Sequence, residues 1–438
     1  METVDLRLEN AKIPYRGSLV SGGVAIADGK LVAIRKGPLL PNADVKIDLR
    51  GMLLLPGVID AHVHFRDPGL TWKEDFASGS MAAAAGGVTT VCDMPNCIPR
   101  TNSLKRFTEK VEIAGKKSYV DFALHAALPK TKEEGIKLMK TGAASFGEVF
   151  TYSEGDAAIR NFLDLGLTIS VHAEDPRVLE RFKSNGNGIE EFIRSRPREA
   201  EISEISRLLP LAENAHIHIC HVTTSESVDL IRRGKKQKNK VTCEVTPHHL
   251  LLSLTHLRRL GPYAHVLPPL RSPADGSDLL RALRDGTIDI VSSDHAPHTA
   301  EEKEKGQANL FEAPPGVVGV ETSLPLMLTL VRKGKLSLFR LIEAMCTSPA
   351  KIFGLRNESG VPKGTLEIGG DADLVVVDQK KKWKLKGKEL HGKTKFTPFE
   401  GREVIGMPTM TFVRGKKVFE EGEIVGKRGY GKFIPRSS

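Results

Sequence analysis

Histidine and carboxylate side chains recur at the ends of short apolar segments along this 438-residue sequence. His62 and His64 end the segment GVIDAHVHF, and single residues end several later segments. Those later candidates are Glu148, His172, His221 and Asp294. Neutral imidazoles and carboxylates suit zinc as ligands, with manganese or cobalt as alternatives. Metal ions in such a set lower the pKa of water and polarise carbonyl groups, so the pattern indicates hydrolytic chemistry.

The spacing of His62 and His64 supports a shared site, because residues two apart on a strand point to the same side. A single histidine near a strand end is usually a hydrogen-bonded core or loop residue. An HxH pair, two single histidines and a final aspartate, all at segment ends, form a stronger signal together. The remaining candidates are assigned to the ordinary class: His125, His216, His218, His248, His249, His256, His265 and His391.

Eight short segments would position these side chains. They are rich in β-formers and nearly unalternated, as strands buried on both faces are. Stretches with helical character lie between them, including 73–85, 133–141, 156–165 and 277–284. This alternation predicts an α/β fold, with a parallel (β/α)8 TIM-like barrel over residues 51–350 that keeps its chemistry at the carboxyl ends of the strands. The eight segments are 57–65, 87–94, 120–128, 143–150, 167–175, 215–222, 241–249 and 288–296.

The two ends of the chain follow a different pattern. Residues 1–50 contain short alternating strands separated by Gly and Asn turns, and residues 364–426 repeat that pattern. We therefore predict a small β-sandwich domain that combines residues 1–50 with residues 351–438.

Composition restricts the class of protein further. Hydrophobic residues make up 40% and charged residues 27%, as in globular proteins. The first ten residues, METVDLRLEN, lack a secretory or membrane-length apolar run, so we expect a cytoplasmic protein without a membrane partner. Five scattered cysteines argue against a disulfide framework or a thiolate zinc site.

The net charge of +10 has two interpretations: attraction of anionic ligands or nucleic acid, or ordinary surface lysine. Aromatic residues make up only 5%, and no nucleic-acid motif with interleaved aromatics occurs. We favour surface lysine and expect no nucleic-acid partner.

Several motifs resemble the dihydroorotases of the amidohydrolase superfamily, of the metal-dependent class I type, over nearly the whole chain. The resemblance implies reversible cyclisation of N-carbamoyl-L-aspartate to L-dihydroorotate by metal-activated hydroxide, in de novo pyrimidine biosynthesis. The motifs are PGVIDAHVHFRDPG (56–69), MPN (94–96), HAED (172–175), TPHHL (246–250), PPLR (268–271), SSDHAPH (292–298), GVVGVET (316–322) and GDADLVVVD (370–378).

The resemblance also implies residue roles. Asp294 would be the catalytic proton shuttle, and Arg66 would hold the substrate carboxylate with a planar guanidinium. Substrate-binding residues would be His64, Arg66, Asn96, His298, Pro315 and Gly316. Metal ligands would be His62, His64, His172, His221 and Asp294. The expected cofactor is zinc, as two divalent ions per chain, with one ion left open.

Two departures from the family pattern bear on the site. Many relatives place a carboxylated lysine at the end of the fourth strand, where this chain has SFGEVF; Glu148 would supply the same oxygen donors directly. Alternatively, Glu148 faces a helix and pairs with a surface lysine. Leu267 precedes PPLR where relatives commonly have Asn, which removes a hydrogen bond to the ring.

Other positions keep alternatives open. Arg66 could be a surface ion-pair partner of Asp67, and Asn96 could merely shape the turn after Pro95. Asp60 could orient a ligand histidine or cap its strand end. The Glu- and Lys-rich stretch 298–315 is either a mobile lid or a solvated loop, and we favour the loop.

Two other functions remain open: a cyclic-amide hydrolase acting on hydantoin or allantoin, and a non-catalytic dihydroorotase-like scaffold. Arg66 favours a small anionic substrate, because dihydroorotate carries a free carboxylate and hydantoin does not. The retained ligands argue against the scaffold. A homo-oligomer and association with aspartate carbamoyltransferase, as in some relatives, are left open.

Overall fold

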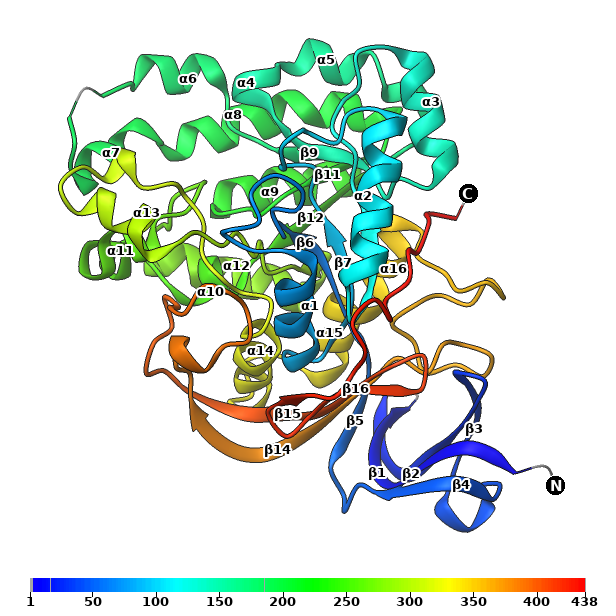
Figure 1. Cartoon of the computed structure of the whole chain (residues 1–438). Helices are drawn as coiled ribbons and strands as arrows, with labels where there is room; N and C mark the ends of the chain where they lie inside the picture. Colours follow the sequence, from blue (N-terminus) through cyan, green and yellow to red (C-terminus); the bar gives the residue numbers. More distant parts are fainter. Residues whose placement is uncertain (1–2, 16, 185, 438) are drawn as a thin grey trace.

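The computed structural model describes residues 3–15, 17–184 and 186–437. It has an α/β architecture, in which helices lie around a set of short central strands (Figure 1). A large sheet built from both ends of the chain lies to one side of these strands (Figure 1).

The central strands are parallel and form two sheets, ordered β13-β12-β11-β10-β9 and β6-β7-β8. Each lies inside a segment predicted as a strand, and most of their residues are buried, as expected for strands covered on both faces. They are β6 (Val58–Val63), β7 (Val88–Asp93), β8 (Asp121–Leu124), β9 (Phe146–Phe150), β10 (Ile169–His172), β11 (Ile217–Ile219), β12 (Val241–Val245) and β13 (Ile290–Val291).

Single parallel bridges connect the two central sheets. Ala126, which follows β8, pairs with Phe146, the first residue of β9. Val63, the last residue of β6, pairs with His295, which follows β13. The His64 amide donates to the His295 carbonyl at 2.8 Å. The last of the eight strands therefore ends beside the first, which brings the HxH pair next to Asp294.

Helices alternate with the strands as predicted, and side-chain caps mark where several begin. The hydroxyls of Thr131, Thr224 and Ser272 accept backbone hydrogen bonds at the starts of α3, α9 and α12. The stretch 156–165 contains only a short helix and a 3₁₀ turn. The helices are α1 (Phe76–Ala85), α2 (Leu104–Lys117), α3 (Lys132–Thr141), α4 (Thr151–Glu154), α5 (Asp156–Arg160), α6 (Pro176–Arg181), α7 (Ile189–Ser195), α8 (Arg198–Leu208), α9 (Ser225–Lys236), α10 (Pro247–Leu251), α11 (Leu254–Leu260), α12 (Pro273–Asp285), α13 (Ala300–Glu304), α14 (Ser323–Arg332), α15 (Leu338–Ile342) and α16 (Ser348–Phe353).

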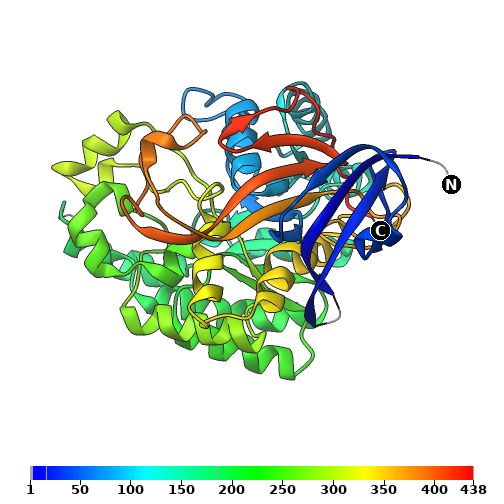
Figure 2. The ribbon, with the colours of Figure 1, turned by 90° about the horizontal axis from the view of Figure 1, so that it is seen from below.

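The remaining strands form one nine-stranded sheet, ordered β17-β16-β15-β14-β5-β1-β2-β3, with β4 beside β1. Figure 2 shows the blue amino-terminal strands next to the orange and red carboxyl-terminal ones. β5 links the two groups, because it pairs with β1 on one side and β14 on the other. The strands are β1 (Val4–Tyr15), β2 (Ser18–Ala27), β3 (Lys30–Arg35), β4 (Ala43–Asp48), β5 (Leu53–Pro56), β14 (Leu374–Lys384), β15 (Glu403–Val413), β16 (Lys416–Glu420) and β17 (Glu423–Ile424).

The nine-stranded sheet packs on the helices around the central strands through α1 and α14. The Thr411 hydroxyl donates to the Ala84 carbonyl at 2.7 Å, and the Ile405 amide donates to the Thr329 hydroxyl at 2.8 Å.

The domain boundaries proposed from the sequence stay a prediction. All five cysteines are buried and free. Among the described residues, no helix has the length and apolar character needed to cross a membrane.

Candidate active site

Three of the predicted ligands meet where β6 and β13 end side by side. The Nε2 atoms of His62 and His64 lie 3.2 Å apart. An Asp294 carboxylate oxygen lies 3.4 Å from His62 Nε2 and 3.1 Å from His64 Nε2. All three residues are buried. The ends of β6 and β13, with the residues that follow them, therefore form one buried polar cluster.

Glu148 lies between this group and two further histidines. Its Oε1 is 2.7 Å from His221 Nε2 and 3.2 Å from His172 Nδ1. Its Oε2 is 3.7 Å from His62 Nε2 and 3.9 Å from His64 Nε2. The alternative, in which Glu148 pairs with a surface lysine, is wrong, because the carboxylate is buried among four imidazoles.

The electrostatic surroundings keep both carboxylates ionised. Burial alone raises the pKa of Glu148, but hydrogen bonds to His172, His221 and His62 outweigh it and lower that pKa well below its usual value. Burial likewise raises the pKa of Asp294, while His62 and His64 lower it further than burial raises it. The cluster therefore presents anionic oxygens beside imidazole nitrogens.

The backbone geometry orients the side chains of this cluster. The Asp60 carboxylate accepts from the amides of His62 at 3.3 Å and Ser293 at 3.0 Å, so it ties the ends of β6 and β13 together. Arg66, His221 and Asp294 have positive φ values of 61°, 31° and 47°. Non-glycine residues rarely adopt this region, and such residues concentrate at functional sites.

Two buried carboxylates that the sequence analysis missed support the predicted ligand histidines. Glu244 Oε1 is 2.5 Å from His62 Nδ1, and Glu174 Oε2 is 2.8 Å from His172 Nε2. Such partners fix the ring orientation of a metal-binding histidine and raise its basicity. The spacing of two from His172 was a usable signal for Glu174, and a charge inside the apolar segment VTCEV was one for Glu244.

The arrangement fits divalent cations. Donor atoms of His62, Glu148 and His221 lie within 4.8 Å of one another, as do those of His62, His64 and Asp294. Because the two sets share His62 and are all buried nitrogen and oxygen donors, they suit ions of the zinc type. The Nδ1 atoms of His64 and His221 have no hydrogen-bond partner among the described residues.

A cavity of about 260 Å³ opens above the cluster and is bordered by every predicted substrate-binding residue. Arg66 does not pair with Asp67, which instead lies 2.6 Å from Lys117 Nζ. Asn96 Oδ1 and Arg66 Nε are buried without a partner among the described residues. Unpartnered polar groups beside a cavity are available to a ligand.

His298 lies between Arg66 and the Pro315 backbone. Its Nε2 lies 3.3 Å from Arg66 and 3.0 Å from the Pro315 carbonyl, and its Nδ1 lies 3.1 Å from Lys73 Nζ. Burial and then the charge of Arg66 hold the pKa of His298 well below its usual value. The neutral ring then donates from Nε2 to Pro315 and accepts from Lys73.

The backbone at position 316 requires glycine. Its φ is +138°, and a Cβ there would lie 2.4 Å from the Ala296 carbonyl oxygen. A side chain would therefore push the backbone away from the cavity.

Comparison with known proteins places this site in a family. The family model described as "Amidohydrolase family" matches residues 53–418. The chain belongs to the amidohydrolase family. It is 39% identical to a dihydroorotase of Methanosarcina acetivorans, with 99% of this chain and 96% of that protein covered. It is 41% identical to a dihydroorotase of Methanothermobacter thermautotrophicus, with 98% and 97% covered.

Among solved structures, an L-hydantoinase (dihydropyrimidinase) from Arthrobacter aurescens superimposes with a TM-score of 0.94. The two sequences are 34% identical, and the match covers 99% of this chain and 100% of that one. The amidohydrolase architecture is therefore shared over the full length of both chains.

Apolar and aromatic side chains also line the amidohydrolase cavity. Leu267, Phe150 and Tyr152 line it, and the last two were missed by the sequence analysis. The Arg196 guanidinium lies over the Tyr152 ring at 4.9 Å, and it also contacts Glu174 at 2.5 Å. A ligand in this cavity thus meets both cationic and amide groups and carbon surface.

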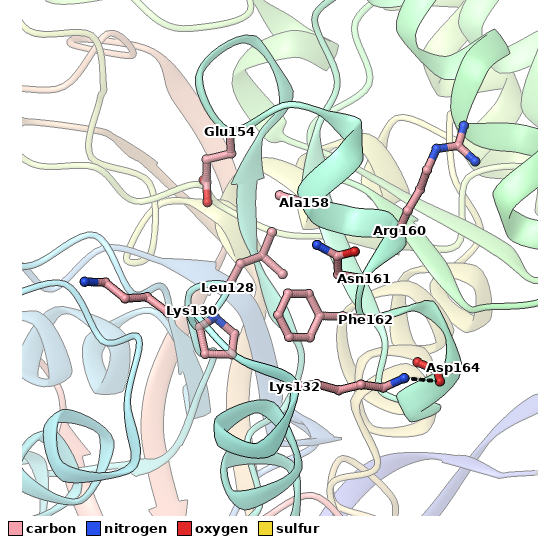
Figure 3. Close-up of a pocket in the computed structure, with 10 residues that line it drawn as sticks. Leu128, Lys130, Lys132, Glu154, Ala158, Arg160, Asn161, Phe162 and Asp164 are labelled. Atoms are coloured by element: carbon pink, nitrogen blue, oxygen red, sulfur yellow. Dashed lines mark hydrogen bonds and ion pairs between the residues drawn. The ribbon is translucent and has the colours of Figure 1, made fainter.

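A larger hollow of about 740 Å³ lies between α3 and α5 (Figure 3). Lys130, Glu154 and the ion pair of Lys132 with Asp164 surround it. The side chains of that ion pair are 47% and 65% exposed, and the hollow includes none of the predicted ligands. The smaller cavity above the histidines is therefore the candidate active site.

Proposed function

We propose that this amidohydrolase is a dihydroorotase, which interconverts N-carbamoyl-L-aspartate and L-dihydroorotate. The observation that carries the proposal is Arg66, which borders the same cavity as the histidine and carboxylate cluster. A guanidinium at that position suits a substrate that has a carboxylate next to a scissile amide. Its dihydroorotase relatives, 39% and 41% identical over nearly the full chain, support this assignment.

We propose that the eight parallel strands close into a (β/α)8 barrel and that the nine-stranded sheet folds as a sandwich. The Val63–His295 and Ala126–Phe146 bridges support closure. We propose zinc as the cofactor, as two ions held by His62, His64, Glu148, His172, His221 and Asp294. When bound, the ions would polarise the scissile carbonyl and lower the pKa of the attacking water.

Substrate recognition falls to the residues around the carboxylate. Arg66 would donate two hydrogen bonds to it, and Asn96 and His298 would complete its coordination. The backbone of Pro315 and Gly316 would face the amide edge of the ring. Leu267 offers carbon surface where a polar side chain would hydrogen-bond the ring.

Asp294 would move the proton. In the hydrolytic direction its carboxylate accepts a proton from the attacking water and then donates it to the leaving ring nitrogen. Its low pKa suits the first step, since the group is ionised at neutral pH. Cyclisation runs through the same transfers in reverse.

A hydantoinase is the second candidate, favoured by the TM-score of 0.94 with the L-hydantoinase and by the apolar and aromatic side chains of Leu267, Phe150 and Tyr152. Hydantoin itself has no carboxylate, so the Arg66 guanidinium would meet no anionic group of the substrate. A cytoplasmic location, a homo-oligomer and association with aspartate carbamoyltransferase stay predictions.

The deciding experiment removes metal with a chelator, restores zinc or manganese, and assays L-dihydroorotate and unsubstituted hydantoin side by side. We expect activity on dihydroorotate that disappears with the metal and returns with it. Faster turnover of hydantoin, or activity that survives chelation, would exclude the proposal.

We propose that Glu148 would take the place of the carboxylated lysine of many relatives as a carboxylate shared by the two ions, and this role has its own test. Metal analysis of Glu148→Ala should show loss of at least one ion per chain, whereas Glu180→Ala, at an exposed position, should bind the full complement. Reactivation of the metal-free wild type with zinc should not depend on bicarbonate, because no lysine needs to be carboxylated. Full metal binding by Glu148→Ala, or a bicarbonate requirement, would contradict the assignment.

A further inference from the structure

The segment between His298 and Pro315 is not the solvated loop that the sequence favoured. It contains α13, which begins at a capping box formed by Thr299 and Glu302. Lys303 on this helix is 0% exposed. Its long side chain therefore points inward, although its neighbours in sequence are glutamates and lysines.

The Lys303 ammonium joins two loops that border the active-site cavity. Nζ donates to the Pro314 carbonyl at 2.8 Å and lies 3.4 Å from the His265 carbonyl. The same His265 carbonyl accepts from the Gly316 amide at 2.9 Å. One loop continues to Leu267 and the other to Gly316, so Lys303 helps to hold together two adjacent loops that border the ring pocket.

This ammonium has no carboxylate within ion-pairing distance among the described residues. Two other buried lysines differ: Lys110 lies 2.5 Å from Asp93, and Lys363 contacts three aspartates. Of the two carboxylates next to it in sequence, Glu302 pairs with Lys73 at 2.8 Å, and Glu304 is exposed. When protonated, Lys303 therefore carries a positive charge with which no carboxylate of the described residues forms an ion pair.

The groups that act on Lys303 come from several elements. Arg66 and Lys73 follow β6, Glu302 lies on α13, and the rings of His265 and His298 adjoin the two loops. Burial, helped by Arg66 and Lys73 and opposed by Glu302, lowers the pKa of Lys303 to about 7. Burial and cationic neighbours lower the pKa of both histidines, so their rings are neutral at pH 7.

We propose that Lys303 is a positioning and specificity residue of this active site, which holds the two ring-facing loops together and makes the cavity selective for anionic ligands. The inference rests on the proposed function, because it requires a carboxylate in the cavity. An anion beside Arg66 stabilises the charged form of Lys303. Binding near neutral pH should then take up a proton, and affinity should fall as pH rises.

Calorimetry with two matched ligands tests this on the metal-loaded enzyme. Orotate carries a ring carboxylate, and uracil is the same ring without it. We expect wild type to take up protons with orotate, seen as a binding enthalpy that changes with the ionisation enthalpy of the buffer. Uracil should give little or no uptake.

Three variants separate charge from positioning. Lys303→Gln keeps hydrogen-bond donors but loses the charge, so orotate affinity should fall about 10-fold at pH 7 while uracil affinity is nearly unchanged. Lys303→Met loses both and should weaken both ligands. Lys303→Arg should keep orotate affinity but lose proton uptake. Lys305→Gln, an exposed neighbour with the same charge change, should behave as wild type.

The outcomes are distinct. If wild type hydrolyses dihydroorotate but binds orotate without proton uptake, or if Lys303→Gln binds orotate as tightly as wild type, the role of Lys303 is wrong while the proposed function stands. If wild type neither hydrolyses dihydroorotate nor binds orotate, both fail. Should the variants not fold, proton uptake by the wild type alone still decides.

Discussion

The two halves of the active site are built differently. The floor consists of histidines and carboxylates at or just after strand ends, and most of their polar atoms contact one another or a further carboxylate. The recognition side consists of loop residues with unpartnered polar atoms, such as Asn96 Oδ1. Strand ends are held by sheet hydrogen bonds, whereas loops can change without disturbing the sheet. Chemistry therefore belongs to the shared framework and specificity to its loops.

Asp294→Asn changes the chemistry of the floor most directly. The amide can still coordinate weakly but cannot shuttle a proton, so we expect kcat to fall at least about 100-fold with the fold intact. Steady-state kinetics with dihydroorotate, alongside circular dichroism, measures this. More than a tenth of wild-type kcat would show that another group carries the proton.

Arg66→Lys is the corresponding change on the recognition side. It keeps the charge but loses the planar pair of donors, so kcat/KM for dihydroorotate should fall by roughly 30- to 1000-fold, or about 2–4 kcal/mol. Metal content should not change, because Arg66 lies outside the floor. An unchanged kcat/KM would remove the carboxylate-binding role.

Glu244→Gln and Glu174→Gln test whether each part of the floor depends on its own supporting carboxylate. Each change should weaken metal binding about 10- to 100-fold, because the histidine it orients becomes less basic and less fixed. Glu244 acts through His62, which both donor sets share, and Glu174 acts through His172, so Glu244→Gln should weaken both ions and Glu174→Gln only one in chelator competition. Glu180→Gln, at the surface, serves as control. The same pattern of weakened ions in both variants would contradict separate supports.

Leu267→Asn should have the smallest effect. It adds a polar group at the ring pocket, and one such hydrogen bond changes kcat/KM for dihydroorotate by roughly 2- to 10-fold. We expect an increase, with metal content unchanged. If the rate instead collapses together with metal binding, the cavity wall and the floor are not independent.

Local patterns were enough to place the strands. The eight segments contain β6 to β13, because burial on both faces leaves short apolar runs that are visible in the sequence. The same reasoning found His62, His64, His172, His221 and Asp294, since each ends or closely follows such a run. Sequence reasoning was less successful for residues 298–315, because the many charged residues there gave no sign that Lys303 is buried.

The sequence alone determined which side chains the strand ends would carry and the order in which they would appear. Only the tertiary structure decided that Glu148 lies among four histidines, that Glu244 supports His62 from 182 residues away, and that Lys303 joins two loops. Strand and helix signals arise from residues a few positions apart. The surroundings of a buried charge depend on elements that become neighbours only when the sheets assemble, and no local pattern encodes that distance.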